Sequence, residues 1–361
     1  MASRPQAVLV SYRLGGADGV GVESAKWARA LDALGFSTRR VAGVIEGARR
    51  PDDTQLPFLA IDAPPDSAPD PGALAAALAG AELVVVENLC SLPLNLGAAT
   101  LARDVLARHP GRVCFHHHDL PWEREQLAHI AGFPPRRPGS LHVTISQHAR
   151  RALWLRGVAA HCIHNAFDFD AFGGDRDATR AGLGFADEDV VLLQPTRAIP
   201  RKNVSGGLRF AAAVARELSE RRVCYWITGP PEDGYDDEFH ALLATATVQV
   251  RVGRAPRAAD AYAAADLVVF PSTWEGFGNP VVEAVAAHRM VAVGSYPVLE
   301  EIVAGIDVLS IDDPREAAAR LRAPDRQRLV RNADVARARF SIEHLPGRIR
   351  AAMTAVGWND W

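Results

Sequence analysis

One stretch in the second half of the chain, residues 266–284, constrains both the fold and the chemistry most strongly. It begins with an apolar run that predicts a buried strand, and a glycine-rich turn follows. Asn279 is a good N-cap and Pro280 suits the first helical position, so a helix is expected to begin there. Glu275 lies in the turn, and Glu283 lies about one turn into the helix. The stretch therefore predicts a strand, a glycine-bearing loop and a helix N-terminus with two carboxylates at a fixed spacing.

This arrangement suits a ligand that carries both a phosphate and hydroxyl groups. The first-turn N–H groups and the helix dipole attract an anion. Gly276 and Gly278 let backbone N–H groups approach a ligand closely. The two carboxylates accept hydrogen bonds, as a polyol requires. A nucleotide sugar has all these groups, although a Gly/Pro turn before a solvated helix face explains the stretch equally well.

Glu275 and Glu283, spaced E-x7-E after Pro271-Ser272 and before Ala284, resemble the signature of retaining GT-B glycosyltransferases of family 4, the glycosyl transferases group 1 type. The resemblance implies an α/β fold of two Rossmann-like domains facing across a cleft, with a C-terminal helix that crosses back to the first domain. It implies a hexosyltransferase. In this family the second Glu holds the donor ribose, and the first Glu lies against the donor sugar. The loop positions that would meet the sugar and phosphate are Gly276, Phe277, Gly278 and Asn279.

Length and composition fit two soluble domains. A chain of 361 residues is long for one domain. A net charge of −3 gives no overall attraction to nucleic acid or an anionic membrane. The four cysteines are scattered without a C-x-x-C pair, which suggests neither a zinc site nor a disulfide framework. With no signal segment and no apolar run near the roughly 18 residues that span a membrane, we expect a cytoplasmic protein without a transmembrane segment.

The strand and helix pattern restarts in the second half, which sets the expected domain boundaries. We predict an acceptor-binding domain over 1–165, a linker over 166–187 where glycines and alternating charges break the periodicity, and a nucleotide-sugar-binding domain over 188–340. Residues 341–361 form the expected C-terminal helix. Residues 313–338 read as helical.

A glycine-rich loop follows the first predicted strand. The dinucleotide fingerprint G-x-G-x-x-G is not met, because the third glycine would fall at Ser24, so NAD binding is unsupported. The resemblance places Gly15 and Gly16 near the donor phosphates. A tight turn between strand and helix is the alternative.

Three consecutive histidines, 116–118, follow another strand and invite a metal interpretation. Adjacent residues on an extended chain point to opposite sides, so all three cannot readily bind one ion. The family carries a histidine here that meets the donor sugar and stabilises charge. His118, just before Asp119, is the best match and His116 the fallback, with a structural histidine network as the alternative.

Arg197 and Lys202, in a loop that leads to a helix, resemble the R-x4-K pair that the family places on the donor diphosphate. Arginine and lysine provide bidentate and point-charge contacts to phosphate. Asn203 stands where a glycine is usual, and a solvated basic loop is a plausible alternative for Arg201. No D-x-D-like acid pair stands at a strand end, so we expect no metal and no cofactor.

Polar residues in loops after first-domain strands suggest a small polar acceptor: Glu87, Asn88, His116, Asp119, Trp122 and Arg124. No amphipathic basic helix with large apolar residues stands out near them, and lipid acceptors tend to need such a surface.

The leading interpretation is a retaining, metal-independent transfer from a UDP-, GDP- or ADP-sugar, with Arg197, Lys202, Glu275 and His118 as the catalytic groups. In the family the acceptor attacks from the front face, and the leaving diphosphate oxygen takes its proton. A sugar-nucleotide epimerase or glycoside phosphorylase of the same fold is the nearest rival, and a non-catalytic nucleotide-sugar-binding protein is a rival of another class.

Overall fold

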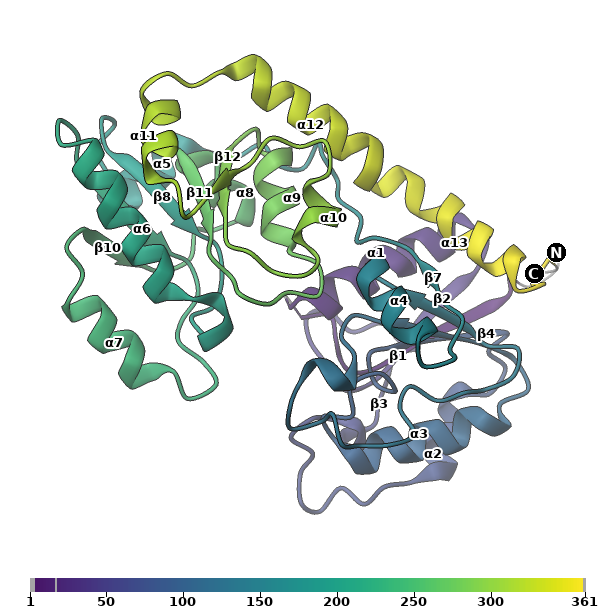
Figure 1. Ribbon diagram of the computed structural model, residues 1–361. Coiled ribbons are helices and arrows are strands. Elements are labelled where there is room, and N and C mark those ends of the chain that lie inside the picture. Colours follow the sequence, from purple (N-terminus) through teal and green to yellow (C-terminus); the bar gives the residue numbers. More distant parts are fainter. Residues whose placement is uncertain (1–3, 17, 360–361) are drawn as a thin grey trace. The chain divides into compact units, whose positions relative to one another are not determined.

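The computed structural model describes residues 4–16 and 18–359. Within them the chain divides into two compact units (Figure 1). The first unit combines Met1–Ala166 with Ile342–Trp361, and the second is the continuous segment Phe167–Ser341.

The first unit is built on a parallel sheet with the strand order β3-β2-β1-β4-β5-β6-β7. Its strands are β1 (Gln6–Leu14), β2 (Ser37–Ile45), β3 (Thr54–Gln55), β4 (Leu83–Glu87), β5 (Arg112–His117), β6 (Leu141–Thr144) and β7 (His161–Cys162). Its helices are α1 (Gly19–Ala33), α2 (Pro71–Leu78), α3 (Leu96–Arg108), α4 (Gln147–Trp154) and α13 (Leu345–Ala355).

The second unit has its own parallel sheet, with the order β10-β9-β8-β11-β12-β13. Its strands are β8 (Val190–Gln194), β9 (Val223–Ile227), β10 (Gln249–Val252), β11 (Leu267–Phe270), β12 (Met290–Val293) and β13 (Leu309–Ser310). Its helices are α5 (Arg176–Leu183), α6 (Val204–Glu217), α7 (Asp236–Ala244), α8 (Ala258–Ala264), α9 (Asn279–Ala286), α10 (Leu299–Val303), α11 (Pro314–Arg322) and α12 (Arg326–Phe340).

Both sheets are covered on both faces, which explains the continuous apolar runs of their strands. Along β1, Ala7 and Leu9 enter the core under α1 and α13, whereas Val8 and Val10 enter the core under α2 and α3. This alternation is the period of two expected of a strand. Because the strands are buried on both faces, polar functional side chains are expected only at the strand ends.

The last helix, α13, packs beside α1 in the first unit (Figure 1). Leu345, Ile349 and Met353 lie in the same core as Trp27 of α1. Side chains spaced four apart lie on one face of a helix, so α13 presents an apolar stripe to that core. The first unit thus takes its core from both ends of the chain.

Two predicted boundaries need correction. The predicted linker, 166–187, lies almost wholly in the second unit and contains α5, whose N-cap Asp175 accepts a hydrogen bond from Ala178 N at 2.9 Å. The predicted helix over 313–338 is two helices, α11 and α12, because Pro324 interrupts the segment between them.

Both sheets have the doubly wound order in which the chain reverses direction beside the first strand. Ligands in such folds bind at the carboxyl ends of the strands, at this switch point. It falls between β1 and β4 in the first unit and between β8 and β11 in the second. These two places are where polar side chains should be sought.

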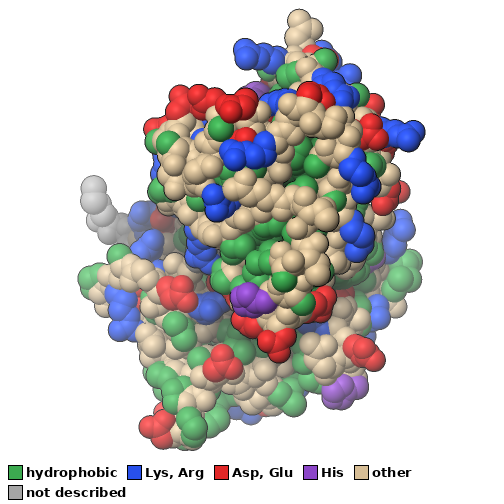
Figure 2. Space-filling view, turned by 90° about the vertical axis from the view of Figure 1, so that its left-hand side faces the viewer, with side chains coloured by type: hydrophobic (Ala, Val, Ile, Leu, Met, Phe, Trp, Pro, Cys, Tyr) green, Lys and Arg blue, Asp and Glu red, His purple; other side chains and the backbone are tan. Residues whose placement is uncertain are grey.

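On the face that Figure 2 presents, acidic and basic side chains are interspersed, in line with the net charge of −3. Across residues 4–16 and 18–359, no helix is both long and apolar enough to cross a bilayer.

Candidate active site

The loops after β8 and β11 meet at the switch point of the second unit and are bonded to each other. Asn203 Nδ2 donates to the Pro271 carbonyl at 3.1 Å, and Thr273 N donates to the Arg201 carbonyl at 2.9 Å. Buried Gln194, at the end of β8, donates to the Lys202 carbonyl at 2.9 Å. Asn203 has a φ of 49°, which an asparagine tolerates, so it serves where a glycine is usual. These bonds hold the basic loop against the glutamate loop.

Glu275 is the anchor of this site. It is 7% exposed, and its two oxygens take different cations. Lys202 Nζ lies 2.5 Å from Glu275 Oε1, and Arg201 Nη1 lies 2.9 Å from Glu275 Oε2. Arg201, for which a solvated loop was a plausible alternative, therefore belongs to the cluster. Two cations around one carboxylate leave the loop pair with a net positive charge.

Lys202 is held in a largely apolar place. Its side chain is 11% exposed, and its ammonium lies 5.3 Å from the centre of the Phe270 ring. Burial lowers the pKa of Lys202, while the charge of Glu275 opposes that shift. The lysine is thus a desolvated cation whose attraction for an anion is weakly screened.

Arg197 does not join Lys202. Its guanidinium pairs with Glu232 at 2.6 Å, and both side chains are more than a third exposed. The two members of the predicted R-x4-K pair therefore have separate partners. An exposed pair of this kind contributes little to stability, so Arg197 can exchange Glu232 for another anion at small cost.

Helix α9 begins at Asn279 and its N-cap is Gly278, which corrects the predicted cap at Asn279. Gly278 has a φ of 103°, and a Cβ there would lie 2.2 Å from Tyr296 Oη. Only glycine meets both conditions. Pro280 occupies the first turn. Since Gly278 contributes no side-chain cap, the first-turn N–H groups of α9 keep their attraction for an anion.

Glu283 projects from α9 and meets Tyr262 of α8. Tyr262 Oη lies 2.5 Å from Glu283 Oε2. Tyr262 is buried and Glu283 is half-buried. Glu275 and Glu283 are thus held by unlike groups, two cations for the first and a phenol for the second. Phe277, between them in sequence, is buried against Phe340 and Phe167.

Gly15 and Gly16 lie at the turn from β1 into α1. Gly15 has a φ of 86°, and a Cβ there would lie 2.3 Å from the Glu46 carbonyl oxygen. Asp18 caps α1 by accepting from Val20 N at 3.0 Å and Gly21 N at 3.1 Å. The tight turn accounts for Gly15, so a phosphate contact at this loop remains a prediction.

A second cluster sits beside the switch point of the first unit, where β4 and β5 end. Parallel pairing sets Glu87 beside His116 in register. Glu87 Oε2 lies 2.8 Å from His116 Nδ1 and 2.8 Å from His118 Nε2. All three residues are buried. The alternation along the strand turns His117 to the opposite side, where it meets Ser91 and His142.

The charges in this cluster are unequal. Although burial raises it, the pKa of Glu87 is lowered by the charges and hydrogen bonds of His116 and His118. Burial lowers the pKa of His116. Burial also acts to lower the pKa of His118, but the hydrogen bond and charge of Glu87 raise it above its usual value. Of the two histidines, His118 therefore takes up a proton more readily and is the better candidate to meet a ligand oxygen.

The same three residues have a donor set that a divalent ion accepts. Their ligand atoms lie within 4.8 Å of one another. Two imidazoles and a carboxylate suit zinc or iron. In this structure they bond to each other through Glu87 Oε2, while Glu87 Oε1 and His116 Nε2 find no hydrogen-bond partner among the described residues. A hydroxyl group or a water that reached these two buried acceptors could donate to them.

The remaining candidate acceptor residues lie in the loops after β4 and β5. Asn88 Oδ1 accepts from His118 N at 3.1 Å and Asp119 N at 3.2 Å and so holds the loop in place. Arg124 lies 3.7 Å from Asp119. Trp122 already has the Arg156 guanidinium 3.8 Å above its ring, so one face of the indole is taken.

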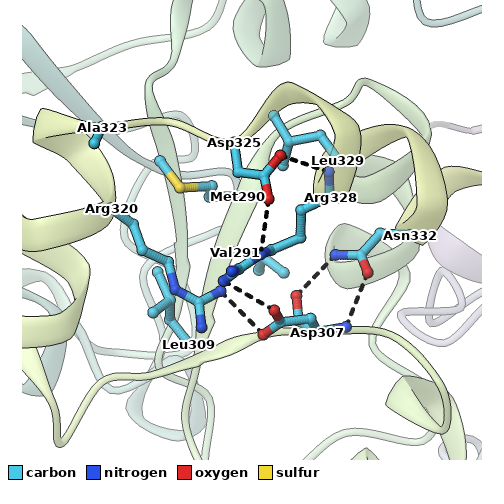
Figure 3. A pocket seen from close by; sticks show the side chains of 10 residues that line it. All are labelled: Met290, Val291, Asp307, Leu309, Arg320, Ala323, Asp325, Arg328, Leu329 and Asn332. Carbon is cyan, nitrogen blue, oxygen red and sulfur yellow. Dashed lines mark hydrogen bonds and ion pairs between the residues drawn. The ribbon is translucent and has the colours of Figure 1, made fainter.

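A small cavity elsewhere in the second unit plays no part in this chemistry. It measures about 50 Å³ and lies near β12, β13, α11 and α12. Asp307 is its central charge and pairs with Arg320 at 3.0 Å and Arg328 at 3.1 Å (Figure 3). Asn332 also bonds to the Asp307 backbone. Because these charges are satisfied by each other and the volume is far below that of a nucleotide, we regard the cavity as structural.

Sequence reasoning missed Tyr262 altogether and gave Arg201 the lesser role. Arg201 could have been suspected from its position beside Lys202. Tyr262 had no such signal, because it lies on a helix before β11 and reaches Glu283 only through the packing of α8 against its neighbours.

Comparison with known proteins bears on both units. A family model described as glycosyl transferases group 1 matches residues 192–323. Mannosylglucosylglycerate synthase of Petrotoga mobilis is 24% identical over 85% of this chain and 87% of its own length. D-inositol 3-phosphate glycosyltransferase 1 of Catenulispora acidiphila is 34% identical over 49% of this chain and 47% of its own.

A solved structure extends the likeness to nearly the whole chain. Anabaena HepE in complex with UDP-glucose superposes with a TM-score of 0.73 at 18% identity, covering 97% of this chain and 99% of the other. At this identity the likeness concerns the fold, and it confirms the predicted architecture of two Rossmann-like domains.

Proposed function

Since residues 192–323 form a glycosyl transferases group 1 domain and the chain is a glycosyltransferase of GT-B fold, we propose that it moves a sugar from a nucleoside diphosphate sugar to a small polar acceptor with retention of configuration. The observation that carries the proposal is the pair Glu275 and Glu283, placed on either side of the α9 N-terminus with Lys202 bonded to the first. This arrangement supplies an anion site and two carboxylates that accept hydrogen bonds from hydroxyl groups, all within one loop and helix.

The donor is assigned to the second unit. Glu283 receives the ribose hydroxyls, the α9 N-terminus and Lys202 receive the diphosphate, and Glu275 meets the sugar. The structure of HepE with UDP-glucose supports a nucleotide sugar as the ligand class, because its fold is similar. Arg197 completes the diphosphate site by leaving its exposed partner Glu232.

The proposed reaction needs no protein nucleophile. The acceptor hydroxyl attacks the anomeric carbon on the face from which the diphosphate departs, so a new C–O bond forms as the old one breaks. The acceptor proton passes to the departing diphosphate oxygen. Lys202, Arg197 and Arg201 stabilise the negative charge on that group, which is the service a divalent ion would otherwise provide.

The first unit is assigned to the acceptor and to one contact with the donor sugar. His118, whose pKa the hydrogen bond and charge of Glu87 raise, is placed on the donor sugar. Glu87, Asn88, His116, Asp119, Trp122 and Arg124 are placed on the acceptor. The orphaned Glu87 Oε1 and His116 Nε2 support a ligand rich in hydroxyl groups.

A transfer assay tests the proposal. UDP-, GDP- and ADP-sugars are offered with soluble sugars, sugar acids and aminocyclitols, with and without EDTA, and products are identified by mass spectrometry and by the configuration of the new bond. We expect one donor class to yield a product with retained configuration in EDTA. Interconversion of the sugar nucleotide alone would favour an epimerase, phosphate-dependent cleavage a phosphorylase, and binding without turnover a non-catalytic protein.

A further inference from the structure

Helices α8 and α9 of the second unit are joined by a buried contact that the proposed reaction does not by itself require. Tyr262, 1% exposed, projects from α8 and brings its hydroxyl to 2.5 Å from Glu283 Oε2 on α9. The Phe172 ring packs edge-on against the Tyr262 ring, with centroids 6.0 Å apart and planes at 77°. The phenol is therefore fixed both at its ring and at its hydroxyl.

The direction of the hydrogen bond is settled by chemistry. A carboxylate only accepts hydrogen bonds, so the phenol must be the donor. Burial and the charge of Glu283 raise the pKa of Tyr262 well above its usual value, and the hydroxyl thus keeps its proton at any working pH. One oxygen of Glu283 is consequently tied to a rigid donor.

We propose that Tyr262 is a positioning residue, which fixes the Glu283 carboxylate so that it accepts hydrogen bonds from the ribose hydroxyls of a nucleoside diphosphate and so selects ribonucleotides over deoxyribonucleotides. The proposal rests on the assignment of the ribose to Glu283. A half-buried glutamate has three rotatable bonds, and holding them before binding avoids the entropy loss that a free side chain incurs when it becomes ordered. The gain in binding free energy depends on the ribose hydroxyls alone, because they are the groups that the carboxylate would contact.

A second link to α8, made by Arg289 in the segment between α9 and β12, provides a matched control. Arg289 Nε donates to the Tyr262 carbonyl at 2.9 Å, and its Nη2 donates to the Ala263 carbonyl at 3.1 Å. Arg289→Met weakens the attachment of α8 without removing the phenol. A purely structural role for Tyr262 would make its variant behave as the Arg289 variant does.

The experiment measures binding to the full chain by calorimetry. UDP, GDP and ADP are compared, and the one that binds is tested beside its 2′-deoxy and 3′-deoxy counterparts. For Tyr262→Phe, which keeps the ring and its packing, we expect the preference for the ribonucleotide over at least one deoxy form to fall by roughly 2- to 10-fold, the equivalent of one side chain that must be ordered on binding. Deoxynucleotide affinity and melting temperature should change much less.

Several outcomes would overturn this inference. An unchanged ribose preference in Tyr262→Phe refutes it, as does a tighter ribonucleotide complex, which would mean that the phenol competes with the ribose. An equal change in Arg289→Met also refutes it. If Tyr262→Phe does not fold, Phe172→Leu, which loosens the ring but keeps the hydroxyl, is expected to show a smaller fall in the same preference, and no fall there refutes the proposal. Glu283→Ala tests the ribose assignment itself, because the variant has no side-chain acceptor and unchanged nucleotide binding in it would remove that assignment.

Discussion

Removal of the Glu275 carboxylate should destabilise the ligand-free chain far more than removal of Lys202. In Glu275→Gln the lysine, 11% exposed, keeps its charge but loses its anion. Stranding one member of a buried ion pair costs about 3–5 kcal/mol. The lysine can escape only by losing its proton, and for an ordinary pKa of about 10.4 this costs roughly 4.6 kcal/mol at pH 7. Because burial already lowers the pKa of Lys202, we expect about 3–4 kcal/mol.

Lys202→Met leaves a different situation. Glu275 retains Arg201 at 2.9 Å, and that arginine is 35% exposed. Solvent screening reduces the value of such a pair, but the carboxylate is not left alone. We expect a loss of about 1.5–2 kcal/mol, at the lower end of the range for a lost hydrogen bond to a charged group. The double variant should be more stable than Glu275→Gln alone, because it buries no unpaired charge.

Differential scanning calorimetry of the four proteins measures these differences. For a unit of this size, 1 kcal/mol corresponds to roughly 2–4 °C in melting temperature. Arg322→Met removes an exposed partner of Glu220 and serves as the surface control, with an expected change below about 1 kcal/mol. In Glu275→Gln the folded lysine has the lowered pKa, so stability should rise from pH 7 to 9 as it deprotonates. Equal losses in both single variants, or no rescue in the double variant, would refute the reasoning.

Three further predictions concern other parts of the chain. Burial lowers the pKa of His117, and it lowers the pKa of His142 to about 4. The free energy of unfolding, measured with urea, should therefore fall by about 1.4 kcal/mol per pH unit per histidine as the pH drops from about 6.5 toward 4. His142→Gln should reduce this pH dependence, whereas His129→Gln, at an exposed position, should not. Transfer should survive chelation, and loss of activity that only magnesium or manganese restores would contradict the metal-free mechanism. Arg124→Ala should raise KM more for an acidic acceptor than for a neutral one in a competition assay, and activity on lipid acceptors alone would rule out the small acceptor.

Local pattern was sufficient for most of the fold. Apolar runs with helical segments between them identified the parallel sheets, because burial on both faces leaves few polar residues in a strand. The predicted linker was wrong because its glycines were given more weight than the two signals that mark α5 as a helix. These are the N-cap Asp175 and the glycine at its C-terminal end, Gly184. The predicted N-cap at Asn279 failed by one residue, since the left-handed conformation at the cap admits Gly278.

The sequence predicted which strand end each site residue follows, but not which residues contact one another. Glu275, Glu283 and Lys202 could be placed on loops, yet the partners of Lys202 and Glu283 depend on how separate βα units pack. The meeting of Glu87 with His116 depends on the register between β4 and β5, which no local pattern encodes. Tyr262 illustrates the same point, because a buried tyrosine on a helix has no sequence feature that distinguishes packing from function.

The route of the chain has a consequence for how the protein is made. The second unit begins and ends at neighbouring residues, since Phe167 pairs with Ser341 and its N–H donates to the Phe340 carbonyl at 2.8 Å. It is therefore a continuous insert inside a first unit that lacks Leu345, Ile349 and Met353 until α13 arrives. The insert contains every element of its own core, whereas the unit begun earlier in synthesis completes the core beside α1 only after α13 has been made. A chain that ended at residue 341 would thus contain every element of the second unit and would lack the helix that completes the first, leaving apolar surface exposed there.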